Sequence, residues 1–91
     1  MFHYVYPAVF YNHENEYQVL IPDINLTTSG ATLDEAYLLA KDFLRAYFTY
    51  ALKFDIATEL PSSYVALFEK CKNQENTYVM LIDALVAKPK D

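Results

Sequence analysis

Apolar residues recur with two different periods along this chain, and the change of period separates predicted strands from predicted helices. The runs FHYVYPAVFY (2–11) and EYQVLIP (16–22) flank the polar segment NHENE, a pattern typical of an antiparallel hairpin. A short third strand is predicted at 26–29, ended by Gly30. The run TYVMLIDALV (77–86) is rich in Tyr, Val and Ile and has no Gly or Pro. It is therefore predicted to be a strand that pairs inside the sheet.

Pro7 interrupts the first of these runs. Proline has no backbone N–H to donate to a ladder, so within sheets it occupies edges, strand starts or bulges. We therefore expect a bulge or an unpaired position at Pro7.

Helical spacing begins at residue 33 and continues to about residue 54. Thr32 is the predicted N-cap, and Glu35, three residues later, completes a capping box. Asp34 and Glu35 also lie where the positive end of the helix dipole favours carboxylates. With a short second helix at 63–72, the predicted fold is α+β: an antiparallel three-stranded sheet plus a C-terminal strand, with the long helix packed on one face.

The long helix is apolar over an arc of about 200°, whereas docking on one sheet needs little more than ~100°. Either another protein chain covers the excess, or a C-terminal segment folds back over it. Leu38, Leu39 and Tyr50 are the candidates for an oligomer interface. The predicted central stripe is Leu33, Ala36, Tyr37, Ala40, Phe43, Leu44, Tyr47, Ala51 and Phe54, with Leu39, Ala46 and Tyr50 on one side and Phe48 on the other.

The charge of the chain narrows the range of partners. Twelve acidic and 7 basic residues give a net charge of −5, which repels nucleic acid and anionic membranes and favours a basic partner. The single cysteine, Cys71, forms no internal disulfide and indicates a reducing compartment, so a cytoplasmic location is expected. At 91 residues the chain is expected to form a single domain, 1–91.

Catalytic chemistry has little support in the sequence. A two-metal nuclease needs clustered carboxylates, and the candidates Glu16, Asp23 and Asp83 are scattered, with no acid in the middle of the first predicted strand. His13 lies near Glu14 and Glu16 in a polar loop, where side chains are usually just solvated. One glycine cannot build a phosphate-binding loop. We expect no enzyme activity, no metal and no cofactor.

Three segments together resemble the HicB-like antitoxin family: YPAVFY (6–11), EYQVLIPDI (16–24) and GATLDEAYLLAKDFL (30–44). The family's Tyr-Pro-Ala start, Pro-Asp turn and Gly-x-Thr-x-x-Glu-Ala helix entry occur here in the same order. The resemblance covers about residues 4–60 and, more loosely, 77–86. The chain departs from the family at Asn25 and Leu26, where relatives continue with a Pro-Gly-Cys-like turn. The matched positions are Tyr6, Pro7, Ala8, Pro22, Asp23, Gly30, Thr32, Glu35, Ala36 and Ala40.

The resemblance implies a partial ribonuclease-H-like fold, β-β-β-α-(α)-β, and an antitoxin that binds and blocks a small basic HicA-like RNA-cleaving toxin. Family members often carry a C-terminal DNA-binding module, but only AKPKD follows the last predicted strand, so we expect no such module and no direct nucleic-acid binding. The predicted partner-binding residues are Glu14, Glu16, Asp23 and Ile24.

Two other hypotheses remain. One is an orphan HicB-like homo-oligomeric module without a toxin partner. The other is a residual ribonuclease-H-type enzyme that depends on Asp23 or Asp83.

Overall fold

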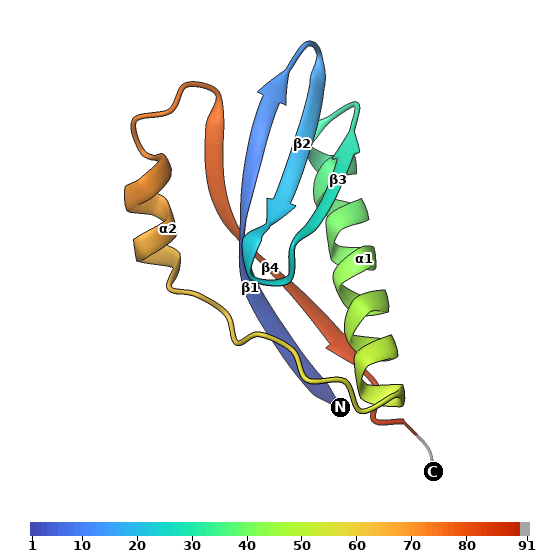
Figure 1. The fold of residues 1–91 in the computed structure, drawn as a ribbon. Coiled ribbons are helices and arrows are strands. Elements are labelled where there is room, and N and C mark those ends of the chain that lie inside the picture. The colour runs from blue at the N-terminus through green and yellow to red at the C-terminus, as the bar shows by residue number, and fades with distance from the viewer. Residues whose placement is uncertain (90–91) are drawn as a thin grey trace.

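The computed structural model describes residues 1–89 and consists of one four-stranded antiparallel sheet and two helices (Figure 1). The strand order is β3-β2-β1-β4, and the predicted fold class is confirmed. The last two residues of the AKPKD tail lie outside the described range. The elements are β1 (Phe2–His13), β2 (Glu16–Ile21), a 3₁₀ turn η1 (Pro22–Ile24), β3 (Leu26–Gly30), α1 (Leu33–Lys53), α2 (Tyr64–Cys71) and β4 (Thr77–Val86).

The β1–β2 hairpin closes more tightly than the polar segment NHENE suggested. His13 pairs with Glu16, which leaves only two residues in the turn. Both have positive φ, 50° at Glu14 and 65° at Asn15. These values match a type I′ turn, whose twist suits the right-handed twist of the flanking strands.

Pro7 lies in unbroken register with β4, opposite Leu81, so the predicted bulge is wrong. The alternative, an unpaired position, fits the alternation of hydrogen bonds. Asn12 donates its backbone N–H to Asn76 on the β4 side. Successive residues of a strand point their N–H groups to opposite sides, so odd-numbered β1 residues face β2. The β1–β2 pairing ends at Val9 and Leu20, and Pro7 lies beyond it, where no ladder bond is lost.

The core lies between the sheet and α1. Its members, fully buried or nearly so, come from alternating positions of the strands and from one stripe of the helix. Phe48 is the largest helical member, and its ring stacks on Tyr4 with centroids 3.8 Å apart. The buried cluster is Tyr6, Ala8, Phe10, Val19, Ile21, Ala36, Ala40, Leu44, Phe48, Ile82, Ala84 and Val86.

The buried stripe of α1 is displaced from the predicted one. Phe48, placed on the margin by the sequence pattern, is buried, whereas Phe43 and Phe54, placed at the centre, are exposed. The predicted stripe followed the widest apolar arc. The sheet instead contacts only part of that arc, and the small Ala36 and Ala40 allow the helix to approach it closely.

The predicted N-cap of α1 is confirmed, whereas the return bond from the Thr32 N–H to the Glu35 carboxylate, which a full capping box requires, is absent from the hydrogen bonds of residues 1–89. Thr32 is the N-cap, and its Oγ1 accepts the backbone N–H of Glu35 at 3.1 Å. Asp34 and Glu35 occupy the first turn.

β4 also differs from the sequence-based prediction, because it lies at the sheet edge and pairs only with β1. Its apolar composition comes from burial under α1 on one face and, in the first part of the strand, from α2 on the other. α2 packs against β4 and β1, across the sheet from α1 (Figure 1). The Tyr64 hydroxyl donates to the backbone carbonyl of Val79 at 3.3 Å. The C-terminal segment therefore covers the sheet and not the excess apolar arc of α1.

Gly30, the only glycine of the chain, joins the sheet to α1 at a point of close approach. A Cβ there would lie 2.5 Å from the backbone N of Ala36 and 2.9 Å from its Cα. Neither atom can move aside without displacing the first turn of the helix. We predict that Gly30→Ala lowers the free energy of unfolding by about 1–3 kcal/mol.

Urea unfolding followed by circular dichroism measures this loss. The neighbouring exposed substitution Ser29→Ala is the control and is expected to change stability by less than about 0.5 kcal/mol. Equal effects of the two substitutions would contradict the close-approach argument.

Candidate functional site

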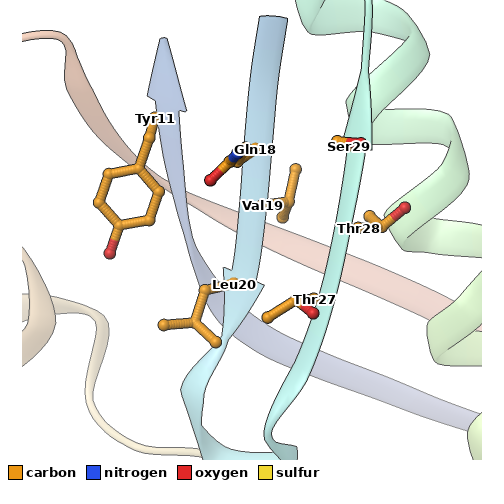
Figure 2. A pocket seen from close by; sticks show the side chains of 7 residues that line it. All are labelled: Tyr11, Gln18, Val19, Leu20, Thr27, Thr28 and Ser29. Atoms are coloured by element: carbon orange, nitrogen blue, oxygen red, sulfur yellow. The ribbon is translucent and has the colours of Figure 1, made fainter. Parts of the chain in front are cut away.

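The sheet face opposite α1 is open over β2, β3 and the part of β1 around Tyr11, and it forms a shallow trough of about 450 Å³. Figure 2 shows the side chains that line it. Because Val19 belongs to the core on the opposite face, alternation places Gln18 and Leu20 on this face. Thr27 pairs with Leu20 and Ser29 with Gln18, so their side chains share it. The lining residues are Tyr11, Gln18, Val19, Leu20, Thr27, Thr28 and Ser29.

The trough continues toward the end of the sheet where the β1–β2 turn and the α2–β4 turn meet. A second depression of about 440 Å³ lies there and shares Tyr11 and Gln18 with the trough. Glu75 lines it, and Glu14 and Glu16 belong to the adjacent hairpin turn. We call these three exposed carboxylates the acidic rim. The trough itself is lined by uncharged residues, and the acidic rim places negative charge at one end of it.

Sequence reasoning identified Glu14 and Glu16 but missed Glu75 and the trough itself. Glu75 is 59 positions from Glu16 in the sequence, and only the pairing of β4 with β1 brings the two turns to one end. A weak signal for the trough was present. Gln18, Thr27 and Ser29 alternate with apolar or half-buried positions, which is the pattern of a sheet face left open to solvent.

Asp23 and Ile24 lie in η1, at the opposite end of β2 from Glu14 and Glu16. The structure therefore divides the four predicted partner-binding residues into two pairs. Both Asp23 carboxylate oxygens accept hydrogen bonds from Ser62, one from its backbone N–H at 2.8 Å and one from its hydroxyl. This contact fastens the connector between α1 and α2 to the sheet. Ile24 packs against the core. The partner contact at these two residues stays a prediction.

The buried Tyr6 binds the same connector between α1 and α2. Its hydroxyl donates to the backbone carbonyl of Glu59. Burial, followed by the nearby Asp23 carboxylate, raises the pKa of Tyr6. The phenol therefore remains a protonated hydrogen-bond donor well into the alkaline range. Asp23 and Tyr6 together give the connector a defined path along the sheet.

Asp83 lies within β4, and both of its carboxylate oxygens have side-chain partners. Lys41 Nζ lies 2.9 Å from one oxygen and His3 Nε2 lies 2.8 Å from the other. The hydrogen bond from Lys41, and then that from His3, hold the pKa of Asp83 below its usual value, and the same bond to Asp83 raises the pKa of Lys41. The arrangement is an ion pair across the edge of the sheet. Within residues 1–89, no group of three or more His, Cys, Asp or Glu is placed to hold a metal ion.

The three predicted oligomer residues separate into two flanks of α1. Leu39 and Tyr50 lie with Phe43 and Phe54 on one flank, and Tyr50 and Phe54 contact each other with ring centroids 4.6 Å apart. Leu38 lies on the other flank, at helical spacing from Lys41 and Arg45 and therefore toward β4. Leu38 and Tyr50 are both more than half exposed, whereas Leu39 is half-buried.

No helix among the described residues has the length and hydropathy needed to cross a membrane.

Solved structures with the same arrangement of strands and helices come from toxin–antitoxin systems. A toxin–antitoxin complex from Streptococcus pneumoniae contains a chain that is 19% identical, with a TM-score of 0.77 over 92% of this chain and 70% of that one. The antitoxin HicB of Burkholderia pseudomallei is 20% identical, with a TM-score of 0.73 over 100% and 70%. A chain of the HicA3 and HicB3 toxin–antitoxin complex is 13% identical, with a TM-score of 0.64 over 91% and 98%.

This chain has the HicB fold. The resemblance found in the sequence is thereby confirmed at the level of the fold. No protein-family model and no curated protein matches the sequence. At identities of 13–20% the comparison establishes the fold, and the surface residues are interpreted from the structure of this chain itself.

The Asp23–Ser62 contact leads to a stability prediction. Asp23→Ala removes both acceptors of Ser62, and we expect a loss of about 1.5 kcal/mol, at the low end for hydrogen bonds to charged groups because the site is exposed. Faster amide hydrogen exchange is expected in the connector, residues 56–63. Asp42→Ala is the control, since Asp42 forms an exposed ion pair with Arg45 one turn away, at 3.2 Å. Unchanged exchange in the connector would contradict the assigned role.

The Asp83 cluster leads to a pH dependence. Because the folded-state pKa of Asp83 lies below its ordinary value of 3.8, the unfolded chain takes up a proton first as the pH falls. The contribution of the carboxylate to stability is therefore complete above about pH 5 and is lost as the pH falls through the folded pKa. In urea unfolding, Asp83→Asn should be less stable than wild type at pH 7 and converge with it in acid.

Lys41→Met should remove most of the pH dependence that Asp83→Asn removes, because the Lys41 hydrogen bond is the first cause of the lowered pKa and the His3 hydrogen bond is the second. The double variant should then lose little beyond either single variant. Parallel profiles of wild type and Asp83→Asn across the acidic range would contradict this account.

Proposed function

We propose that this chain is the antitoxin of a type II toxin–antitoxin system and that it acts in the cytoplasm by binding a small, basic, HicA-like RNA-cleaving toxin. The observation that carries the proposal is the HicB fold, which spans 91–100% of this chain in the three matches from toxin–antitoxin systems. An antitoxin of this kind acts by covering the toxin and uses no catalytic residue of its own.

The charge of the chain supports a basic partner. A net charge of −5 attracts a protein whose own surface is built to bind RNA. Electrostatic complementarity of this kind raises the association rate and suppresses wrong partners more than it adds affinity. The acidic rim of Glu14, Glu16 and Glu75 concentrates this charge at one end of the sheet.

The open sheet face supplies the contact area beside that rim. The trough combines one aromatic residue, Tyr11, with amide and hydroxyl groups from Gln18, Thr27 and Ser29. Tyrosine is enriched at protein interfaces because it buries a large surface and still donates a hydrogen bond. We assign the toxin contact to the trough and the acidic rim together, with Glu14 and Glu16 as its predicted charged residues.

The alternative function, a homo-oligomeric module without a toxin, has one observation in its favour. The α1 flank with Leu39, Phe43, Tyr50 and Phe54 carries more exposed apolar surface than a monomer requires. The experiment below distinguishes this function from the antitoxin.

The test begins with small basic proteins encoded next to the gene for this chain. Each is expressed alone, purified and assayed for RNA cleavage. We expect one of them to cleave RNA and to be inhibited by an equimolar amount of this chain. If no neighbouring product binds the chain, or the bound product still cleaves RNA, the antitoxin function is contradicted and the homo-oligomeric module is favoured.

Surface variants then locate the contact. Thr27→Arg places a long basic side chain in the trough and is expected to weaken inhibition at least tenfold, or ~1.4 kcal/mol. Thr49→Arg is the matched control, because Thr49 is also exposed but lies on α1, across the sheet from the trough. Glu14→Lys is expected to slow association, with a difference from wild type that shrinks at high salt. Equal inhibition by both arginine variants would exclude the trough.

A further inference from the structure

The outer edge of β4 carries backbone groups that α2 leaves open. In the β1–β4 register the residue numbers of two partners always add up to 88, so even-numbered residues of β1 lie opposite even-numbered residues of β4. The bond from the Asn12 N–H to the Asn76 carbonyl shows that these even-numbered pairs are the hydrogen-bonded ones. Odd-numbered residues therefore point their N–H and C=O groups outward. Tyr64 from α2 covers the first part of this edge by bonding the Val79 carbonyl. Within residues 1–89, no hydrogen bond reaches the outward groups of Leu81, Asp83 and Leu85.

Apolar side chains accompany this open edge. Leu81 and Leu85 are 50% and 55% exposed, on the sheet face opposite α1. Val5, which pairs with Asp83, lies between them on the neighbouring strand and is also exposed. A long apolar strand edge with unpaired backbone groups is a ready template for another strand, and monomeric proteins usually protect it with a charge, a proline or a bulge. Between Leu81 and Val86 the one protecting feature is the charge of Asp83.

The charges beside the edge are balanced. A groove of about 210 Å³ runs between α1 and this edge, and its lining includes two bases and two acids: Lys41, Arg45, Asp42 and Asp83. The acid excess of the whole chain, which favours a basic partner, is thus missing here. A balanced set of this kind is complementary to itself, because each base on one copy can meet an acid on the other.

We propose that the open edge of β4 pairs antiparallel with the β4 edge of a second copy of this chain, joining two sheets into one of eight strands. Pairing centred on Asp83 sets Leu81 of each copy opposite Leu85 of the other, which places these exposed leucines against each other across the seam. It also keeps the strands clear of α2, which limits the edge at Val79.

The two Asp83 carboxylates face each other at the centre of this pairing. Like charges directly opposite destabilise a sheet, but each carboxylate already binds its own Lys41 at 2.9 Å, so the central cluster has no net charge. Leu38 lies on the same flank of α1 as Lys41 and Arg45 and is 59% exposed. In the proposed dimer Leu38 would lie next to the β4–β4 contact, on the side of the joined sheet where the two α1 helices face each other, and this position explains why it is exposed in a single copy.

Sedimentation velocity of the purified chain alone tests the proposal. We expect a dimer for wild type. Leu85→Pro removes only an outward N–H and leaves the bonds to β1 intact, and Leu81→Lys places a charge at the seam. Each should raise the dimer dissociation constant at least tenfold. Leu60→Lys, in the exposed connector, is the control and should remain dimeric. Circular dichroism verifies that the variants are folded.

Amide hydrogen exchange locates the interface independently of any variant. The amides of Leu81, Asp83 and Leu85 should exchange slowly in the dimer and speed up on dilution, whereas those of Ile82 and Ala84 stay protected by β1 at every concentration. A monomeric wild type would overturn the proposal. So would a dimer that survives both edge variants and is dissolved by Tyr50→Lys, because that result places the interface on the other flank of α1. Both measurements use no toxin, so their outcome is separate from that of the antitoxin function.

Discussion

The alternation of hydrogen bonds along β1 is the constraint on which the rest of the structure depends. Even-numbered residues bond to β4 and odd-numbered ones face β2, and the β2 pairing begins only at Val9. This one pattern makes Pro7 harmless in a strand, because its missing N–H faces the side where no partner is present. It also decides which β4 groups point outward. Shifting the register by one residue would exchange the core and solvent faces of the strand, removing Phe10 from its place under α1.

Much of this fold could be predicted from the sequence because its local signals agree with one another. The strands, the Thr32 cap and the start of α1 rest on interactions within a few residues, so periodicity and capping rules find them. The displaced stripe of α1 could not be predicted in this way. The helix has apolar residues over most of its circumference, and only the sheet decides that Phe48, and not Phe43, is buried. β4 has the composition of an interior strand because α1 covers one of its faces and α2 covers the first part of the other, while its edge stays free.

The candidate site was harder to predict than the fold, because its residues are brought together by contacts between distant parts of the sequence. Glu14 and Glu16 are visible as acids in a turn, but Glu75 joins them only through the pairing of β1 with β4. Asp23 was selected as an exposed acid, yet in the folded chain both of its oxygens bind Ser62, 39 residues away. An acidic residue in a polar turn has the same local signature whether it meets a partner or a distant part of its own chain. Only tertiary structure separates the two roles.

The two proposed contacts lie on separate parts of the sheet and are compatible in one assembly. The trough and acidic rim use the β1–β3 face and the hairpin end, whereas the open edge uses the second half of β4. α2 packs against β4 and β1 and ends the open edge at Val79. A dimer joined at β4 would then present two troughs related by the two-fold axis. A target with two copies of the matching surface could bind both troughs at once, which would raise its effective affinity for the dimer. In such a dimer the short helix α2, whose one buried residue is Cys71, would confine the contact to the second half of β4 and leave the trough and the acidic rim of each copy free.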